Sequence, residues 1–306
     1  MSAIETEALR RQYGERAVVD GIDLRVPEGT VHALLGPNGS GKTTTVRMLA
    51  TLLRPSGGRA RVLGHDTVTA ARAVRRRIGL VGQFHAVDPL ATGRQNLVMF
   101  ARLNGLAAPA ARRRADELLA RFDLAEAGDR LVRTYSGGMR RRLDILAGTV
   151  VRPEVLFLDE PTTGLDPHSR DDIHRYLAEA VAAGTTVLLT TQYLDEAERL
   201  ADAVTILDAG RIVATGTLAE IVRTVGVRLE VAVPDEQRAA TAAVMVRLGG
   251  TPVPHSDSAY TFGAAAPALL TVVRALDAAG VEARDIGRRT GTLDDAFLAL
   301  TARRSA

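Results

Sequence analysis

The stretch "LLGPNGSGKTTT", residues 34–45, constrains the fold of this 306-residue chain more than any other. It follows the apolar run "TVHALL" and leads into "KTTTVRMLATLL", which has a helical pattern. A loop of the form G-x-x-x-x-G-K-[ST] belongs between a strand and a helix, because its backbone N–H groups and the helix N-terminus then converge on a phosphate. The sequence therefore predicts a strand–loop–helix unit that binds a nucleotide.

Lys42 in this loop is the only lysine among the 39 lysines and arginines of the chain. A compact ammonium group reaches β- and γ-phosphates inside a tight loop, whereas the planar guanidinium of arginine is wider and differently directed. Thr43 offers a hydroxyl group to Mg²⁺. The candidate ligands of the nucleotide in this loop are Gly36, Asn38, Gly39, Ser40, Gly41, Lys42, Thr43 and Thr44.

An acidic pair follows the apolar run "VLFL" at residues 155–158. Asp159 ends this predicted strand, where its carboxylate can hold Mg²⁺ through water. Glu160, the next residue, is placed to accept a proton from an attacking water molecule. A phosphate loop alone does not separate kinases, GTPases and ATPases. The acidic pair narrows the field toward an enzyme that hydrolyses a nucleotide with Mg²⁺ as a cofactor, and ATP is the nucleotide that the family resemblance described below implies.

Composition excludes several other classes of protein. Hydrophobic residues make up 46% of the chain and charged residues 25%, as in globular proteins with a sizeable core. The net charge of +3, with both signs interspersed, indicates no nucleic-acid partner. Cysteine is absent, which rules out disulfides and thiolate metal sites. No apolar run is long enough to span a membrane or to form a secretion signal, so any membrane span must come from another chain.

Apolar strands alternate with helical patterns through most of the chain. Strands are predicted at 18–26, 30–35, 78–81, 154–160 and 185–191, with a hairpin at 203–216 that turns at Asp208–Gly210. Helical periodicity dominates the segment 91–150. This order predicts an α/β fold with a largely parallel sheet and a helical insertion.

The pattern changes near residue 226. Between residues 227 and 287 the predicted order is strand, helix, two short strands, helix and strand, the ferredoxin-like βαββαβ unit. A terminal helix in "TLDDAFLALTARR" follows, with Thr292 as its N-cap. We therefore predict a nucleotide-binding domain at 1–226 and a small accessory α+β domain at 227–306, which carries no catalytic constellation.

The sequence "YSGGMRRRLDIL", residues 135–146, precedes Asp159, and "GLD" at 164–166 follows it. Together with the glycine-rich loop, these motifs resemble ATP-binding-cassette (ABC) ATPases, over about residues 1–225. The finer pattern of "GQFHAVDPLATGRQNL", "TYSGGMRRRLDI" and "TTQYLDEAE" is most similar to ATPases of daunorubicin/doxorubicin-resistance exporters. The resemblance implies an ABC-type P-loop ATPase with a RecA-like core and a helical subdomain.

The resemblance also implies roles for residues outside the loop. Tyr13 matches the aromatic residue that stacks on adenine, although it could be an isolated surface tyrosine. Gln83 matches the glutamine that contacts Mg²⁺ and senses the membrane subunit. Ser136, Gly137 and Gly138 match the signature that binds the γ-phosphate held by a second protomer. The arginine run 140–142 could help to hold phosphate, but a solvated charged face is the favoured interpretation for most of it.

The chain departs from the family pattern at two places. Tyr135 and Met139 replace the ends of the usual L-S-G-G-Q signature, while its Ser-Gly-Gly centre is kept. Gln192 stands where the family has a histidine. Glutamine can donate a hydrogen bond to the γ-phosphate but cannot carry a proton, so we expect an altered rate rather than lost hydrolysis. The alternative is that Gln192 only packs at the end of a strand.

The leading hypothesis is the ATPase subunit of an exporter that drives drug or antibiotic efflux. It implies a homodimer that sandwiches ATP, at the cytoplasmic face of the membrane, with a separate membrane-spanning subunit docking near Gln83–Phe100. An ATPase of a lipid exporter or of an importer remains an alternative. Soluble DNA-repair ATPases of this superfamily carry a long coiled-coil insertion, and none lies between Lys42 and Asp159. Translation factors of this superfamily carry two cassettes in one chain, whereas only one is visible in this sequence. A non-hydrolysing ATP sensor is also disfavoured, because it would not need Glu160.

Overall fold

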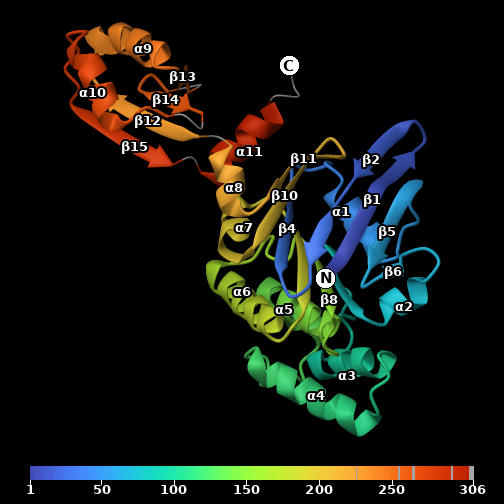
Figure 1. Cartoon of the computed structure of the whole chain (residues 1–306). Coiled ribbons are helices and arrows are strands. Elements are labelled where there is room, and N and C mark those ends of the chain that lie inside the picture. Colours follow the sequence, from blue (N-terminus) through green and yellow to red (C-terminus); the bar gives the residue numbers. More distant parts are fainter. Residues whose placement is uncertain (225, 254–255, 264–265, 291, 303–306) are drawn as a thin grey trace. The chain divides into compact units, whose positions relative to one another are not determined.

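A six-stranded sheet brings the ends of several parallel strands to one edge in the computed structural model (Figure 1). Its strand order is β11-β10-β4-β9-β8-β7, and the neighbours from β10 to β7 pair in parallel. The structure describes residues 1–224, 226–253, 256–263, 266–290 and 292–302. The strands of this sheet are β4 (Val31–Leu35), β7 (Ile78–Val81), β8 (Val155–Asp159), β9 (Thr186–Thr191), β10 (Ala203–Asp208) and β11 (Arg211–Gly216).

The central strands of this sheet are buried along their whole length. Every residue of β4, β8 and β9 is buried, as expected for a parallel sheet with helices on both faces. α5 contacts β7, α6 contacts β9, and α7 contacts β4 and β9. These contacts confirm the predicted parallel sheet. The helices packed on it are α1 (Lys42–Leu49), α5 (Gly137–Gly148), α6 (Pro167–Ala182) and α7 (Leu194–Leu200).

A second, antiparallel sheet is a feature that the sequence pattern does not predict. Its order is β2-β1-β5-β6, and β3 also pairs with β1. α1 contacts strands of both sheets, and Ile4 and Phe157 belong to the shared core. The strand expected at 18–26 is two strands, β2 and β3. The elements of this layer are β1 (Ser2–Tyr13), β2 (Arg16–Ile22), β3 (Arg25–Pro27), β5 (Gly57–Val62), β6 (His65–Asp66) and α2 (Ala71–Arg75).

Helices occupy most of the segment 91–150, as the sequence predicts. α3 begins with a capping box in which Thr92 and Gln95 bond to each other's backbone N–H groups. α3 and α4 lie side by side (Figure 1). α5 begins after Ser136, whose hydroxyl oxygen accepts a hydrogen bond from the N–H of Met139. The further elements are α3 (Gly93–Leu103), α4 (Ala108–Arg121) and the 3₁₀ helix η1 (Val132–Thr134).

The chain divides into two compact units, Met1–Val213 and Ala214–Ala306. This division comes earlier than the predicted boundary after Gly226. The reason is that α8 (Leu218–Arg223) contacts α11 (Leu293–Ala302) and therefore belongs with the second unit. All the residues predicted to bind or hydrolyse nucleotide lie in the first unit.

The second unit contains the predicted ferredoxin-like order. Its sheet has the strand order β13-β14-β12-β15, with α9 and α10 as the connecting helices. The Oγ1 of Thr292 accepts a hydrogen bond from the N–H of Asp295 at 3.2 Å, which confirms the predicted N-cap of α11. Residues 254, 255, 264, 303 and 304 of the predicted elements lie outside the described residues. The elements are β12 (Val227–Ala232), η2 (Asp235–Gln237), α9 (Arg238–Arg247), β13 (Thr251–Pro252), β14 (Ala259–Phe262), α10 (Leu269–Asp277) and β15 (Asp285–Thr290).

Candidate functional site

The glycine-rich loop connects β4 to α1, as predicted, and two of its glycines are sterically required. A Cβ atom on Gly36 would lie 2.3 Å from the carbonyl oxygen of Leu207. Gly41 has a φ of 105°, in the left-handed region, and a Cβ atom there would lie 2.7 Å from the carbonyl oxygen of Val18. Any side chain at either position would displace the loop from the end of the sheet.

Lys42 is the first residue of α1, and its ammonium group is directed back into the loop. Nζ donates hydrogen bonds to the carbonyl oxygens of Gly36 at 2.7 Å and Pro37 at 3.1 Å. Burial lowers the pKa of Lys42, while the carboxylates of Glu160 and Asp159 act to raise it. The loop thus places the positive charge of Lys42 where it can attract the negative charge of a bound phosphate.

The side chain of Asp159 bonds to Thr43 at the start of α1 and to Thr190 in β9. Its Oδ1 accepts hydrogen bonds from the hydroxyl groups of Thr190 at 2.6 Å and Thr43 at 3.1 Å. The amide Nε2 of Gln83 donates to Oγ1 of Thr43 at 3.3 Å. The structure therefore brings together a hydroxyl, a carboxylate and an amide that the sequence predicts as Mg²⁺ contacts.

The chemistry of these donors fits Mg²⁺ bound together with a nucleotide. Mg²⁺ prefers oxygen ligands and is usually held by one or two carboxylates, substrate phosphates and water. Within the described ranges, no group of three or more histidine, cysteine, aspartate or glutamate side chains could hold a metal ion on its own.

Glu160 lies next to the phosphate loop in a strained backbone conformation. Its φ of 51° is in the left-handed region, which is unfavourable for a residue with a side chain. Its N–H donates to both the carbonyl oxygen and Oγ1 of Thr190, each at 3.1 Å. Glu160 lines a cavity of about 140 Å³ together with Lys42, Thr43 and Gln83. A carboxylate at this point can accept a proton from water beside a phosphate.

The same cavity includes most of the other predicted loop residues. Asn38, Gly39, Gly41 and Thr44 line it. Ser40 is buried instead, and its backbone N–H bonds to the carbonyl oxygen of Pro37.

The other predicted residues lie outside this cavity. Tyr13 ends β1 with its side chain 48% exposed, and the guanidinium of Arg11 lies 4.5 Å from the ring centre. Gln192 is exposed directly after β9. Ser136 and Gly138 lie at the start of α5, and Gly137 lines a neighbouring cavity of about 390 Å³ with Gln83 and Glu160. The start of α5 therefore borders a cavity that Lys42 does not line.

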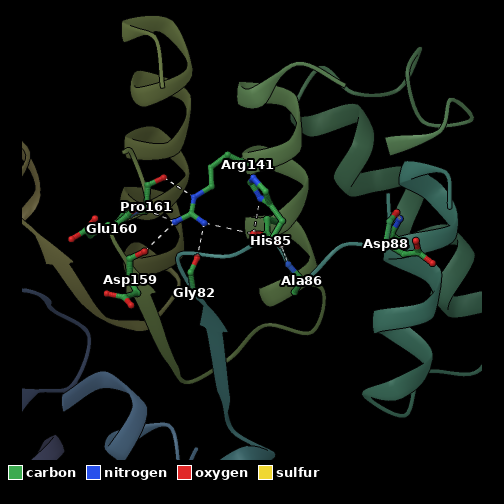
Figure 2. Close-up of polar contacts among 10 residues, drawn as sticks. Gly82, His85, Ala86, Asp88, Arg141, Asp159, Glu160 and Pro161 are labelled. Carbon is green, nitrogen blue, oxygen red and sulfur yellow. Dashed lines mark hydrogen bonds and ion pairs between the residues drawn. The ribbon is translucent and has the colours of Figure 1, made fainter. Parts of the chain in front are cut away.

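Arg141 corrects one expectation. The sequence favours a solvated face for most of the arginine run, but Arg141 is only 5% exposed and the Arg142 side chain only 14%. Arg140 is also only partly exposed, so the expectation is wrong. The guanidinium of Arg141 donates hydrogen bonds to four carbonyl oxygens (Figure 2). Asp144, three residues later in α5, is also buried. One available signal was the acidic residue three positions later in an otherwise apolar stretch, since such spacing places both charges on one face of a helix.

Comparison with known proteins shows to which family a chain with this arrangement belongs. The model of the ABC transporter family matches residues 19–163. The daunorubicin resistance ATP-binding protein DrrA3 of Streptomyces coeruleorubidus is 52% identical over 98% of this chain and 96% of its own length. The chain belongs to the ABC transporter family. This ABC ATPase is similar along almost its whole length to proteins of the drug-resistance type, which confirms the resemblance seen in the motifs.

Further relatives agree with this assignment. The daunorubicin/doxorubicin resistance ATP-binding protein of Streptomyces peucetius is 49% identical over 98% of this ABC ATPase and 92% of its own length. A solved structure of an ATP-binding subunit of an ABC transporter matches with a TM-score of 0.67 at 29% identity, covering 72% of this chain and 92% of its own. ATP binding and hydrolysis are the activity of this family, and an ATP-binding transporter subunit acts with a membrane partner. Among the helices described, none is long and apolar enough to cross a membrane.

Proposed function

We propose that this ABC ATPase powers the export of an amphipathic antibiotic through a separate membrane-spanning subunit. The observation that carries the proposal is the match over almost the full length of both chains to a daunorubicin resistance protein. The catalytic cluster around Lys42, Asp159 and Glu160 supplies the chemistry that such a motor requires.

Each residue of the cluster has a role in this proposal. Lys42 neutralises the β- and γ-phosphates, while the loop N–H groups bind the same oxygens. Thr43, Gln83 and Asp159 hold Mg²⁺, which supplies charge neutralisation at the phosphates when bound. Glu160 accepts the proton of the attacking water. Two residues outside the cavity complete the set, because Tyr13 stacks on adenine and Gln192 donates a hydrogen bond to the γ-phosphate.

The proposal includes a homodimer at the cytoplasmic face of the membrane. Ser136, Gly137 and Gly138 start α5, where N–H groups and the helix dipole favour an anion, so they suit the γ-phosphate held by a second protomer. The membrane subunit docks near Gln83–Phe100. Two apolar side chains support that position, since Phe84 is 82% exposed and Leu90 is exposed as well.

Two substitutions test the chemistry. We expect Lys42→Ala to abolish ATP binding, because the buried cation that faces the phosphates is lost. Glu160→Gln should keep ATP binding and stop turnover, because an amide cannot accept the proton. Equilibrium ATP binding, steady-state hydrolysis and size analysis with ATP and Mg²⁺ measure these effects. Glu126→Gln, the same change on an exposed residue, is the control.

The outcomes separate the parts of the proposal. A Glu160→Gln protein that binds ATP fully and forms a dimer supports the sandwich, whereas one that hydrolyses ATP like the parent contradicts the role of Glu160. The membrane subunit is first identified by co-purification with this chain. Cells that express both proteins should then accumulate less of a fluorescent anthracycline than cells that express the same subunit with the Glu160→Gln chain. Equal accumulation in both would reject the cargo class while leaving the ATPase activity standing.

A further inference from the structure

Arg141 on α5 bonds to two segments of the chain that the proposed reaction uses. Its Nε donates to the carbonyl oxygen of Pro161 at 2.8 Å, and its Nη2 donates to those of Glu160 at 3.0 Å and Asp159 at 3.2 Å. Its Nη1 donates to the carbonyl oxygen of Gly82 at 2.7 Å. A guanidinium presents its N–H donors in a rigid planar fork, so these four carbonyl oxygens are fixed relative to one another (Figure 2).

This fork holds one side of the strained Glu160 residue. The N–H of Glu160 is bound by Thr190 in β9, and its carbonyl oxygen is bound by Arg141. A left-handed conformation of a residue with a side chain is unfavourable and persists only where surrounding contacts enforce it. Arg141 therefore supplies one of three sets of contacts at this residue. The third comes from Thr163, whose N–H donates to the Glu160 carbonyl oxygen at 3.5 Å and whose Oγ1 donates to the Glu160 carboxylate at 3.4 Å.

Asp144 extends the same network to the loop that follows Gln83. One carboxylate oxygen accepts a hydrogen bond from the N–H of Ala86 at 2.8 Å, and the other lies 3.2 Å from Nδ1 of His85 and 3.6 Å from Nη1 of Arg141. Asp144 is buried, and breaking one partner of a buried ion pair is strongly unfavourable. The loop 82–86 is therefore bound at Gly82 by Arg141 and at Ala86 by Asp144.

The next residues connect this loop to α3. The N–H of Asp88 donates to Oδ1 of Asn96 at 2.7 Å, and Nδ2 of Asn96 donates to the carbonyl oxygen of Asp88 at 3.0 Å. Asn96 is fully buried. A displacement of α3 or of residues 82–88 would consequently strain the bonds to Asp144 and Arg141.

We propose that Arg141 is a positioning residue for Glu160, and that Arg141 and Asp144 couple docking of the membrane subunit on residues 83–100 to ATP hydrolysis. The coupling half of this inference rests on the proposed function. Neither residue contacts the reacting atoms. Both act through backbone groups, Arg141 on Glu160 and Asp144 on the docking loop.

Arg141→Lys tests the positioning half in the isolated chain. Lysine keeps the charge but lacks the fork, so it cannot hold all four carbonyl oxygens. We expect ATP affinity to stay within about twofold, while single-turnover hydrolysis falls on the order of tenfold to a hundredfold because the base is displaced. Arg142→Lys is the matched control, since Arg142 bonds to Asp172 at 3.1 Å and to none of residues 82–88 or 159–161 among the hydrogen bonds described.

A double variant shows whether Arg141 acts through Glu160. If it does, adding Arg141→Lys to Glu160→Gln should not lower the residual rate further, because residues acting as a unit are non-additive. A further drop of the same size in the double variant would overturn the positioning role. An Arg141→Lys protein with the parental rate, or a control that loses as much as Arg141→Lys, would overturn it too.

Asp144→Asn tests the coupling half in the complex with the co-purified membrane subunit. The amide keeps the size of the side chain but removes the charge that faces Arg141 and His85. We expect the ratio of ATPase rates with and without the membrane subunit to fall at least threefold, with a smaller loss in the isolated chain than for Arg141→Lys. A parental ratio would overturn the coupling. If the parent itself shows no stimulation, the proposed function fails, while the isolated-chain results still decide the positioning role. Should Arg141→Lys fail to fold, Arg141→Gln decides it by the same measurements.

Discussion

At the scale of single residues, Gln192 stands where the family resemblance leads us to expect a histidine. It is exposed directly after β9, and β9 lies between β4, which leads into the phosphate loop, and β8, which ends at Asp159. Ligands of open α/β sheets gather at this carboxyl edge. A hydrogen bond from the Gln192 amide to the γ-phosphate is therefore compatible with its place in the sheet.

We expect Gln192→Ala to lower turnover on the order of tenfold to a thousandfold, with much less effect on ATP binding, because it removes one donor near developing charge. Gln192→His should keep activity and add a steeper pH dependence near neutrality, where imidazole titrates. Steady-state ATPase rates with the membrane subunit present measure both. If Gln192→Ala matches the parent, the side chain only packs at the strand end.

His32 in β4 makes stability depend on pH. Burial lowers the pKa of His32 to about 4 from 6.5, and its Nε2 lies 2.8 Å from Oγ1 of Thr205. Between pH 4 and pH 6.5, His32 binds more protons in the unfolded chain than in the folded one. The stabilising contribution of the neutral imidazole is therefore fully present above pH 6.5 and is lost as the pH falls toward 4. Protonation of this histidine should lower the free energy of unfolding by about 2 kcal/mol when the pH falls from 7.5 to 5.

Urea unfolding of the parent and of His32→Gln at both pH values measures this contribution. Glutamine does not titrate, so the free energy of unfolding of the variant should change less over the same interval. His168→Gln, at an exposed histidine, is the control and should behave as the parent does. An unchanged pH dependence in His32→Gln would assign the effect to other groups.

At the scale of elements, the sequence predicts the parallel sheet better than the antiparallel one. β4, β8 and β9 are short apolar runs because both of their faces are buried, and such runs are visible without any partner. β1 has no such signal. Its residues are mixed in polarity, Ala8 has a φ of 44°, and its pairing with β2 shifts register at Leu9/Arg10, which breaks the alternation expected of a strand.

The same difference explains which site residues the sequence reveals. Lys42 and Asp159 follow strands whose ends meet at one edge of the sheet, so their proximity follows from the fold class. Arg141 has no comparable signature, because its four acceptors are backbone carbonyl groups of residues distant in the chain. Any residue has a carbonyl group, so the sequence does not show that these four are the partners of Arg141. They are selected by the tertiary structure, in which α5 packs against β7 and Arg141 reaches the segments that follow β7 and β8. Periodicity alone could not distinguish Arg141 from Arg140 and Arg142, which are only partly buried.

At the scale of the whole molecule, the division into two units predicts that nucleotide binding does not require residues 227–306. All residues around the phosphate loop belong to Met1–Val213, and the second unit has a core of its own that includes Leu229 and Phe262. A cut after Val213 would remove half of β11, which pairs with β10 at the edge of the parallel sheet. A cut after Gly226 keeps β11 whole and is the better place to separate the units.

We expect a chain of residues 1–226 to bind ATP within about threefold of the parent, since no ligand of the phosphates is lost and such a change is under about 1 kcal/mol. Loss of residues 227–306 leaves α8 without α11, which it contacts, so the shortened chain should be less stable to heat. ATP titration and thermal unfolding measure both effects. A protease site inserted after Gly226 gives a second route, because the chain can be cut after it has folded. If the cut or shortened protein is folded but binds ATP much more weakly than the parent, residues 227–306 contribute to the nucleotide site and the predicted division of labour is wrong.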